Sequence, residues 1–156
     1  MIRKYIYILI ICFLMQIFLA DIFSISGVRP DFLILFILYF AVNFGSFKGT
    51  LAGFGTGIIV NLFDSGMTFG LLPLIYSIVG YTGGFLKTKH YKMIPFYFNF
   101  SCFSIIIGSF FVYSYFNYNY LFYNDIRIFL LTWLKTTLYT ISLLAIVQFI
   151  VPLRKT

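Results

Sequence analysis

The sequence is poor in charged and metal-binding residues. Only 10% of its 156 residues are charged, and it has four acidic residues, two cysteines and one histidine. The four acids lie at the ends of separate apolar segments, and no cluster of cysteine, histidine and carboxylate suits hydrolysis or metal binding. Nucleotide-binding loops and basic stripes interleaved with aromatics are also missing. We therefore expect a protein that is not an enzyme, uses no metal or cofactor and binds no nucleic acid.

Hydrophobic residues, in contrast, make up 62% of the sequence, and aromatic residues 23%. A soluble domain is normally about half apolar and a quarter charged, and a chain of this length buries only a limited fraction of its surface. Lipid must then cover the remaining apolar surface. The composition predicts one integral membrane domain over residues 1–156, an all-α bundle of transmembrane helices. Cys12 and Cys102 are expected to act as small buried hydrophobic residues.

Charged and turn residues divide the chain into six apolar segments. We predict spanning helices at residues 5–21, 31–44, 49–64, 69–86, 94–115 and 128–151. The first resembles a signal peptide without a clear cleavage site, and we interpret it as a retained helix. The second and third are short for a hydrocarbon core of about 30 Å. They extend through flanking residues, lie inside the bundle, or form a hairpin that enters the bilayer part-way.

The basic residues separate between the two sides that six crossings define. One side receives eight of them: Arg3, Lys4, Lys48, Lys87, Lys89, Lys92, Arg154 and Lys155. The other side receives Arg29 and Arg127, and all four acids lie on or next to it. Cytoplasmic loops are enriched in lysine and arginine. The distribution predicts that both termini are cytoplasmic.

Glycines recur every fourth residue through the third segment. The series is Gly45, Gly49, Gly53 and Gly57, continued by Asn61, and the fourth segment carries the pair Gly80 and Gly84. A four-residue spacing places small residues on one helix face, where two backbones approach closely in lipid. Two interpretations stay open: packing within this chain, or an interface with a partner. Asn61 either bonds to a neighbouring helix or contacts a ligand.

Four charged residues are candidates for polar contacts at the outer ends of the helices: Arg29, Asp31, Asp64 and Lys135. The run Arg29-Pro30-Asp31 indicates a helix start, with proline at the first helical position. Lys135 lies inside the last predicted span. It either extends toward the outer surface, or forms an intramembrane site with Asp64 or Asp31 as acid partner.

Aromatic residues crowd the predicted outer loop at residues 115–124, which contains four tyrosines. Tyrosine at interfacial depth is typical of the aromatic belts of membrane proteins. A contact surface for an extracytoplasmic partner is the alternative interpretation.

An ordered set of short motifs over residues 27–86 resembles the rod shape-determining protein MreD family. The set is Arg29-Pro30-Asp31-Phe32-Leu33, Tyr39-Phe40, Gly49-Thr50-Leu51-Ala52-Gly53-Phe54, Gly57, Asn61-Leu62-Phe63-Asp64-Ser65, Phe69-Gly70-Leu71 and Gly80-Tyr81-Thr82-Gly83-Gly84. The family tends to carry an acid where this chain has Asn61, and residues from Lys87 onward match no motif.

This resemblance implies a non-enzymatic, multi-pass subunit of the bacterial cytoplasmic membrane. Its members act in cell elongation with MreC, the MreB filament and the RodA–transpeptidase pair, and so organise lateral peptidoglycan synthesis and cell shape. A weaker resemblance extends to the membrane-embedded substrate-binding subunits of energy-coupling-factor vitamin transporters. In that alternative, Arg29, Asn61, Asp64 and Lys135 are candidate contacts to a small molecule.

Overall fold

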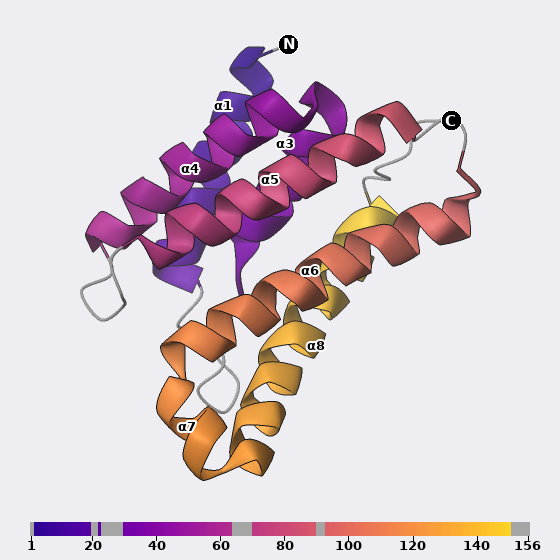
Figure 1. Cartoon of the computed structure of the whole chain (residues 1–156). Helices are drawn as coiled ribbons and strands as arrows, with labels where there is room; N and C mark the ends of the chain where they lie inside the picture. Colours follow the sequence, from indigo (N-terminus) through magenta and orange to yellow (C-terminus); the bar gives the residue numbers. More distant parts are fainter. Residues whose placement is uncertain (1, 20–21, 23–29, 64–69, 90–92, 151–156) are drawn as a thin grey trace.

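The computed structural model describes the chain apart from residues 1, 20–21, 23–29, 64–69, 90–92 and 151–156, and all regular secondary structure in the described part is helical (Figure 1). The all-α prediction is therefore confirmed. The elements are α1 (Ile2–Leu14), η1 (Met15–Leu19, a π-helical turn), α3 (Phe32–Phe44), α4 (Ser46–Phe63), α5 (Leu71–Lys89), α6 (Pro95–Asn117), α7 (Asn119–Asn124) and α8 (Ile126–Ile150).

Helices occur at the positions expected for the six segments, with one addition. The aromatic loop between the last two segments contains the short helix α7, which we did not predict. Among the described residues, only α6 and α8 combine the length and mean hydropathy expected of a membrane span, and α3 is apolar but has 13 residues. The described part of the chain thus contains two helices that are long and apolar enough to cross a membrane.

The chain runs back and forth through two groups of helices (Figure 1). Helices α1, α3, α4 and α5 pack together, and α6 and α8 form a hairpin beside α5, closed by α7. The start of α1, the turn from α3 to α4 and the ends of α5 and α8 lie toward the upper and right side of Figure 1. The start of α3, the end of α4 and α7 lie toward the lower and left side. Consecutive long helices therefore alternate in direction.

The core is centred on α3, because apolar side chains surround this helix on nearly every face. Its residues Leu33, Ile37 and Leu38 are fully buried. They pack in one cluster with buried residues of the neighbouring helices: Ile75, Tyr76 and Val79 of α5, Phe98, Cys102 and Ile106 of α6, and Leu144 of α8. A helix that is hydrophobic all round is expected to be buried. Cys102 is buried as predicted, and Cys12 is half-buried.

Candidate functional site

Helices α4 and α5 meet along a glycine seam, in which the backbones of the two helices touch. A Cβ atom added to Gly49 would overlap the Gly80 carbonyl, and one added to Gly53 would overlap the Tyr76 carbonyl. One added to Gly57 would overlap the backbone of Pro73. Each of these glycines lets α5 approach where any larger residue would separate the helices.

The second glycine pair completes the seam from the α5 side. A Cβ atom on Gly80 would overlap the backbone of Gly49, and one on Gly84 would overlap that of Ser46. Gly45 has a different role from the one predicted. It caps α3 with φ 95° and donates its N–H to the Ala41 carbonyl. A positive φ favours glycine, so Gly45 turns the chain from α3 into α4.

The geometry of the seam corresponds to the first of our two interpretations, packing within the chain. Gly49, Gly53 and Gly57 are buried against α5. A separate helix cannot reach this face while α5 covers it. A docking surface for a partner must therefore be sought elsewhere on the molecule.

Asp31 forms the start of α3 and ties it to α5. Its Oδ1 accepts hydrogen bonds from the backbone N–H groups of Leu33 and Ile34, each at 3.0 Å. Its Oδ2 accepts a hydrogen bond from the Tyr76 hydroxyl at 2.8 Å. An aspartate that caps a helix satisfies two N–H groups that lack partners within the helix. The carboxylate is thus engaged in holding two helices together.

Gln16 holds the same end of α3 from the opposite side. Its side-chain oxygen accepts a hydrogen bond from Phe32 N–H at 2.9 Å, and its amide donates to the Pro30 carbonyl at 3.2 Å. Because Asp31 is the N-cap, Pro30 lies just outside the helix rather than at its first position, which corrects our prediction. Gln16 and Tyr76 were not among the residues that we singled out.

Asn61 is buried near the end of α4, and its amide has no hydrogen-bond partner among the described residues. The side chain is 6% exposed, and within the described part of the chain neither Oδ1 nor Nδ2 is paired. A buried amide without partners is costly, by about 1–3 kcal/mol. The hydrogen bond that we expected to a neighbouring helix is thus not seen.

The outer-end charges do not assemble into one site in the described part of the chain. Lys135 is exposed on α8, on the side of Leu131, Leu134 and Leu138, which are exposed too. Asp31, one of its two predicted acid partners, is engaged with Tyr76 and α3 instead. Arg29 and Asp64 lie outside the described residues.

Helix α8 buries polar as well as apolar side chains, and it exposes many large apolar ones. Thr137 and Thr140 are 3% and 0% exposed, whereas Leu131, Leu138 and Phe149 are 56%, 62% and 93% exposed. Helix α6 buries Ser109 and Ser114 together with apolar residues, and it exposes large apolar side chains such as Phe100, which is 62% exposed. Exposed apolar surface of this extent is unfavourable in water.

Helices α5 and α6 leave an apolar groove of about 300 Å³ between them. Its walls combine branched apolar side chains with small residues: Ile75, Ile78 and Thr82 of α5, and Ser104, Ile105, Gly108, Ser109 and Val112 of α6. A Cβ atom added to Gly108 would meet nothing within 4 Å. In contrast to the glycine seam, the space beside Gly108 is unfilled. This groove is the candidate functional site.

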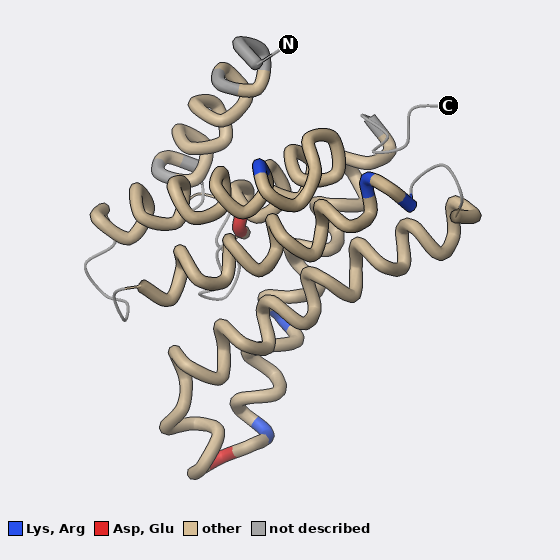
Figure 2. The backbone as a smooth tube through the Cα atoms, turned by 45° about the horizontal axis from the view of Figure 1, so that its top comes forward, with Lys and Arg blue, Asp and Glu red and all other residues tan. Residues whose placement is uncertain are grey.

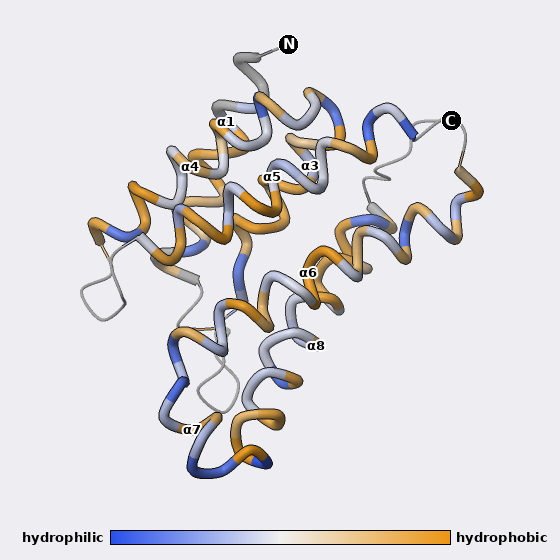
Figure 3. Tube along the Cα trace, in the orientation of Figure 1, coloured by the Kyte–Doolittle hydropathy of each residue, from blue (hydrophilic) through white to orange (hydrophobic). Residues whose placement is uncertain are grey.

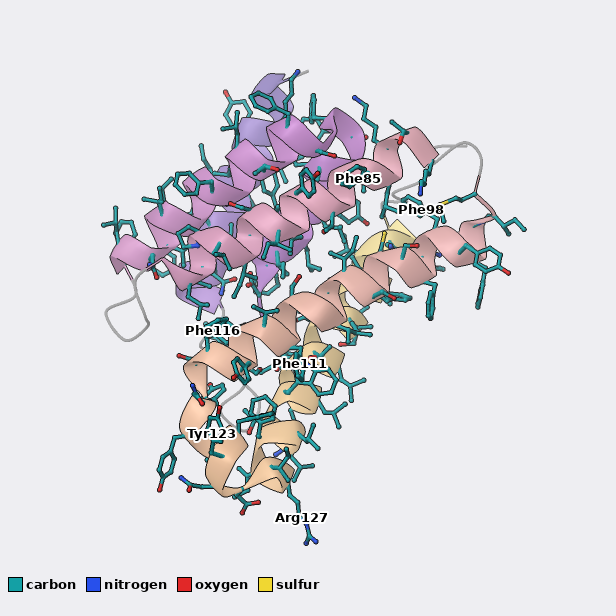
Figure 4. The ribbon with its side chains drawn as sticks, in the orientation of Figure 1. Phe85, Phe98, Phe111, Phe116, Tyr123 and Arg127 are labelled. Atoms are coloured by element: carbon teal, nitrogen blue, oxygen red, sulfur yellow. The ribbon has the colours of Figure 1, made fainter. Side chains whose placement is uncertain are left out.

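Exposed aromatic rings cover the tip of the hairpin at α7 (Figure 4). Phe116, Tyr120 and Tyr123 are 55%, 77% and 73% exposed. Phe122 packs against Phe129 with ring centroids 5.1 Å apart, which attaches α7 to α8. The tip is compatible with both of our interpretations, an aromatic belt or a partner surface.

Comparison with known proteins gives no match to a family model, to a curated protein or to a solved structure. Within the described residues, no group of three or more His, Cys, Asp or Glu side chains is placed to hold a metal ion.

Proposed function

We propose that this chain is a polytopic membrane protein with six crossings. The large exposed apolar surface of α8 supports a lipid environment, because exposed leucines have favourable surroundings in hydrocarbon. At about 1.5 Å per residue, the 18 residues of α4 and the 19 of α5 extend about 27 and 28 Å, close to the thickness of a bilayer core. Helix α3 rises only about 20 Å, but it lies inside the bundle, where a short helix is tolerated.

The charges support an orientation with both termini in the cytoplasm. Lys48, Lys87 and Lys89 lie where α3 turns into α4 and where α5 ends. Asp31 and Asp125 directly precede α3 and α8, so Asp31 lies at the end of α3 opposite the turn that leads to Lys48. Figure 2 shows that few charged residues lie along the described helices. Figure 3 shows hydrophilic residues at both of these ends and hydrophobic ones along the helices between them. Lysine-rich ends of a membrane protein face the cytoplasm.

Within that framework, the chain acts as a non-enzymatic assembly subunit that receives a transmembrane helix of another protein. The observation that carries this proposal is the open groove between α5 and α6, lined by Ser104, Gly108 and Ser109. Helix pairs in membranes associate through small residues that allow close approach. The space beside Gly108 is open to a second helix, whereas the corresponding space beside Gly53 is already filled by α5.

The resemblance of residues 27–86 to the MreD family identifies the partner that we favour. A single-pass protein of the MreC kind would insert its helix into the groove and thereby connect the chain to the MreB filament and the RodA–transpeptidase pair. The protein would then help to organise lateral wall synthesis. The Asp31 anchor and the glycine seam serve this role indirectly, because they set the positions of α3, α4 and α5.

A groove-filling substitution tests the proposal. Gly108→Leu fills the space beside α6, and Gly55→Leu is the matched control, because a Cβ atom at Gly55 also meets nothing within 4 Å but lies on α4, outside the groove. We expect Gly108→Leu to lower the recovery of co-expressed MreC at least tenfold, which corresponds to about 1.4 kcal/mol. Gly55→Leu should leave recovery unchanged. Equal recovery with both variants, at unchanged thermal stability, would exclude the groove as the docking site.

The topology is tested separately with reporter fusions. A cytoplasm-dependent reporter after Thr156 should be active, and one inserted at Tyr120 of α7 should not. A periplasm-dependent reporter should give the reverse pattern. If the cytoplasm-dependent reporter were active at both sites, Tyr120 and Thr156 would lie on the same side of the membrane, and α8 would not cross it.

A small-molecule binding subunit of the energy-coupling-factor type is the second candidate, and one observation favours it. The Asn61 amide is buried and has no partner in the described part of the chain, as a group that binds a ligand would be. Asp31, by contrast, is occupied by α3 and Tyr76. A vitamin-like molecule that co-purifies from mild detergent, and is lost in Asn61→Leu, would favour this function.

A further inference from the structure

Three lysines gather where α4 begins and α5 ends, and they define a basic corner: Lys48, Lys87 and Lys89. The Lys87 ammonium donates a hydrogen bond to the Phe44 carbonyl at 3.2 Å. The Lys48 ammonium lies 5.7 Å from the centroid of the Phe44 ring. Both ammonium groups thus contact Phe44, the last residue of α3. Lys89 follows in the last turn of α5.

Helix stability explains only part of this arrangement. Lys87 and Lys89 occupy the last turn of α5, where cations are favoured by the helix dipole. Lys48 occupies the first turn of α4, where a cation is disfavoured. The two acidic residues in the described part of the chain, Asp31 and Asp125, directly precede α3 and α8 and belong neither to the α3–α4 turn nor to the end of α5.

Exposed aromatic rings lie on the same two helices as the basic corner. Phe47 precedes Lys48 on α4 and is 76% exposed, and Tyr81 and Phe85 are 52% and 49% exposed on α5 (Figure 4 labels Phe85). The rings of Tyr81 and Phe85 form an edge-to-face pair with centroids 4.8 Å apart. Cations next to exposed aromatic rings match the boundary between lipid headgroups and acyl chains.

We propose that the basic corner binds headgroup phosphates of anionic phospholipids in the cytoplasmic leaflet. Lys48 and Lys89 each contact a phosphate, and the acyl chains follow the exposed rings of Phe47, Tyr81 and Phe85. The charge complementarity is direct, because three cations without a nearby described carboxylate face a leaflet that carries anionic lipid. The proposal rests on the membrane placement and orientation proposed above, and it is independent of MreC.

Lipid-dependent thermal unfolding of the full chain in mild detergent tests the proposal. Phosphatidylglycerol is compared with phosphatidylcholine of the same acyl composition. The test variant is Lys48→Gln with Lys89→Gln, and Lys87 is kept because it bonds to Phe44. The control, Arg127→Gln with Lys135→Gln, removes the same charge from the first half of α8, which is not part of the basic corner. Membrane fractionation, run in parallel, reports on placement in the bilayer by itself.

We expect phosphatidylglycerol to raise the melting temperature of the wild type and of the control, and phosphatidylcholine to raise it much less. In the test variant the apparent affinity for phosphatidylglycerol should fall about thirty-fold, at about 1 kcal/mol for each lysine. High salt should weaken the effect in the wild type.

Three results would overturn the proposal. One is equal stabilisation by the two lipids, and another is an equal loss in test and control variants. The third is a test variant that responds to phosphatidylglycerol as the wild type does but no longer recovers a cytoplasmic protein in pull-downs. The basic corner would then bind protein rather than lipid. A chain absent from the membrane fraction would instead refute the proposed placement.

Discussion

Replacing Gly53 with alanine should separate α4 from α5 and destabilise the protein. The added methyl group would overlap the carbonyl carbon and oxygen of Tyr76 and approach Ser77 N, all of which are backbone atoms of α5. A flexible side chain would move aside, but a helix backbone moves only as a whole. Gly80 and Gly57 lie on the same seam, so any separation at Gly53 also loosens the contacts on either side of it.

The expected magnitude follows from two opposing terms. Overpacking of a tight contact costs about 1–3 kcal/mol, and a contact with backbone belongs at the upper end of that range. Alanine in a helix interior regains about 0.5–1 kcal/mol relative to glycine. The net loss is then about 2 kcal/mol. In Gly55→Ala the first term disappears, because nothing lies within 4 Å of the added atom, and the substitution should be neutral or slightly stabilising.

Thermal unfolding in mild detergent measures both variants side by side. With about 2–4 °C for each kcal/mol in a chain of this size, Gly53→Ala should lower the melting temperature by about 4–8 °C. Gly55→Ala should keep it or raise it by about 1–4 °C. The two substitutions are chemically identical, on one helix and two positions apart. If Gly53→Ala proves as stable as Gly55→Ala, α4 and α5 do not pack through this seam.

Two further predictions concern the α3 anchor and a buried thiol. Asp31→Ala should lower the free energy of unfolding by about 1–3 kcal/mol, because it removes the helix cap and leaves the Tyr76 hydroxyl without this acceptor. Asp31→Asn should keep most of the cap. Denaturant unfolding measures both variants, and equal stability of the two would contradict the anchor. Cys102 is fully buried and should react with a maleimide only when the protein unfolds, whereas half-buried Cys12 should react in the folded protein. Mass spectrometry of the labelled peptides distinguishes the two cysteines.

The positions of the helices could largely be predicted from apolar segments and charged boundaries. The exception is α7, whose Tyr-rich and Asn-rich sequence has no helical periodicity. Its six residues are too few to be stable alone. They are held by the packing of Phe122 against Phe129 and Tyr115, with ring centroids 5.1 Å away in each case. A helix that depends on such tertiary contacts is not encoded in its own segment.

The α3 anchor was predictable in part, for a related reason. A cap at Asp31 follows from local sequence, because an aspartate before an apolar helix satisfies the N–H groups just after it. Its bond to Tyr76 joins residues 45 positions apart, and the bonds of Gln16 join residues 14 and 16 positions apart. These partners depend on which helices are neighbours, and periodicity within one helix does not contain that information.

The glycine series, too, was predictable only as far as local sequence determines it. Because its face is covered by α5, a partner surface must be sought in the other half of the molecule. Spacing alone correctly placed Gly49, Gly53 and Gly57 on one face of α4, but it did not say which helix covers that face. The matching pair Gly80 and Gly84 was a clue, since two smooth faces in one chain can pack on each other. With that surface occupied, substitutions such as Gly53→Leu would report on folding and say nothing of a partner.

Binding is therefore best sought where small residues remain uncovered. Helix α6 has Gly108 in an open groove, and the helix that pairs with it, α8, is flanked by exposed leucines rather than by another helix. The hairpin of α6 and α8 also contains buried hydroxyls without partners, those of Ser114 and Thr140. Packing is thus tightest around α3 and least complete in the hairpin, and a partner helix gains the most contact there. This is why Gly108 rather than Gly53 is the position at which assembly and folding can be separated by experiment.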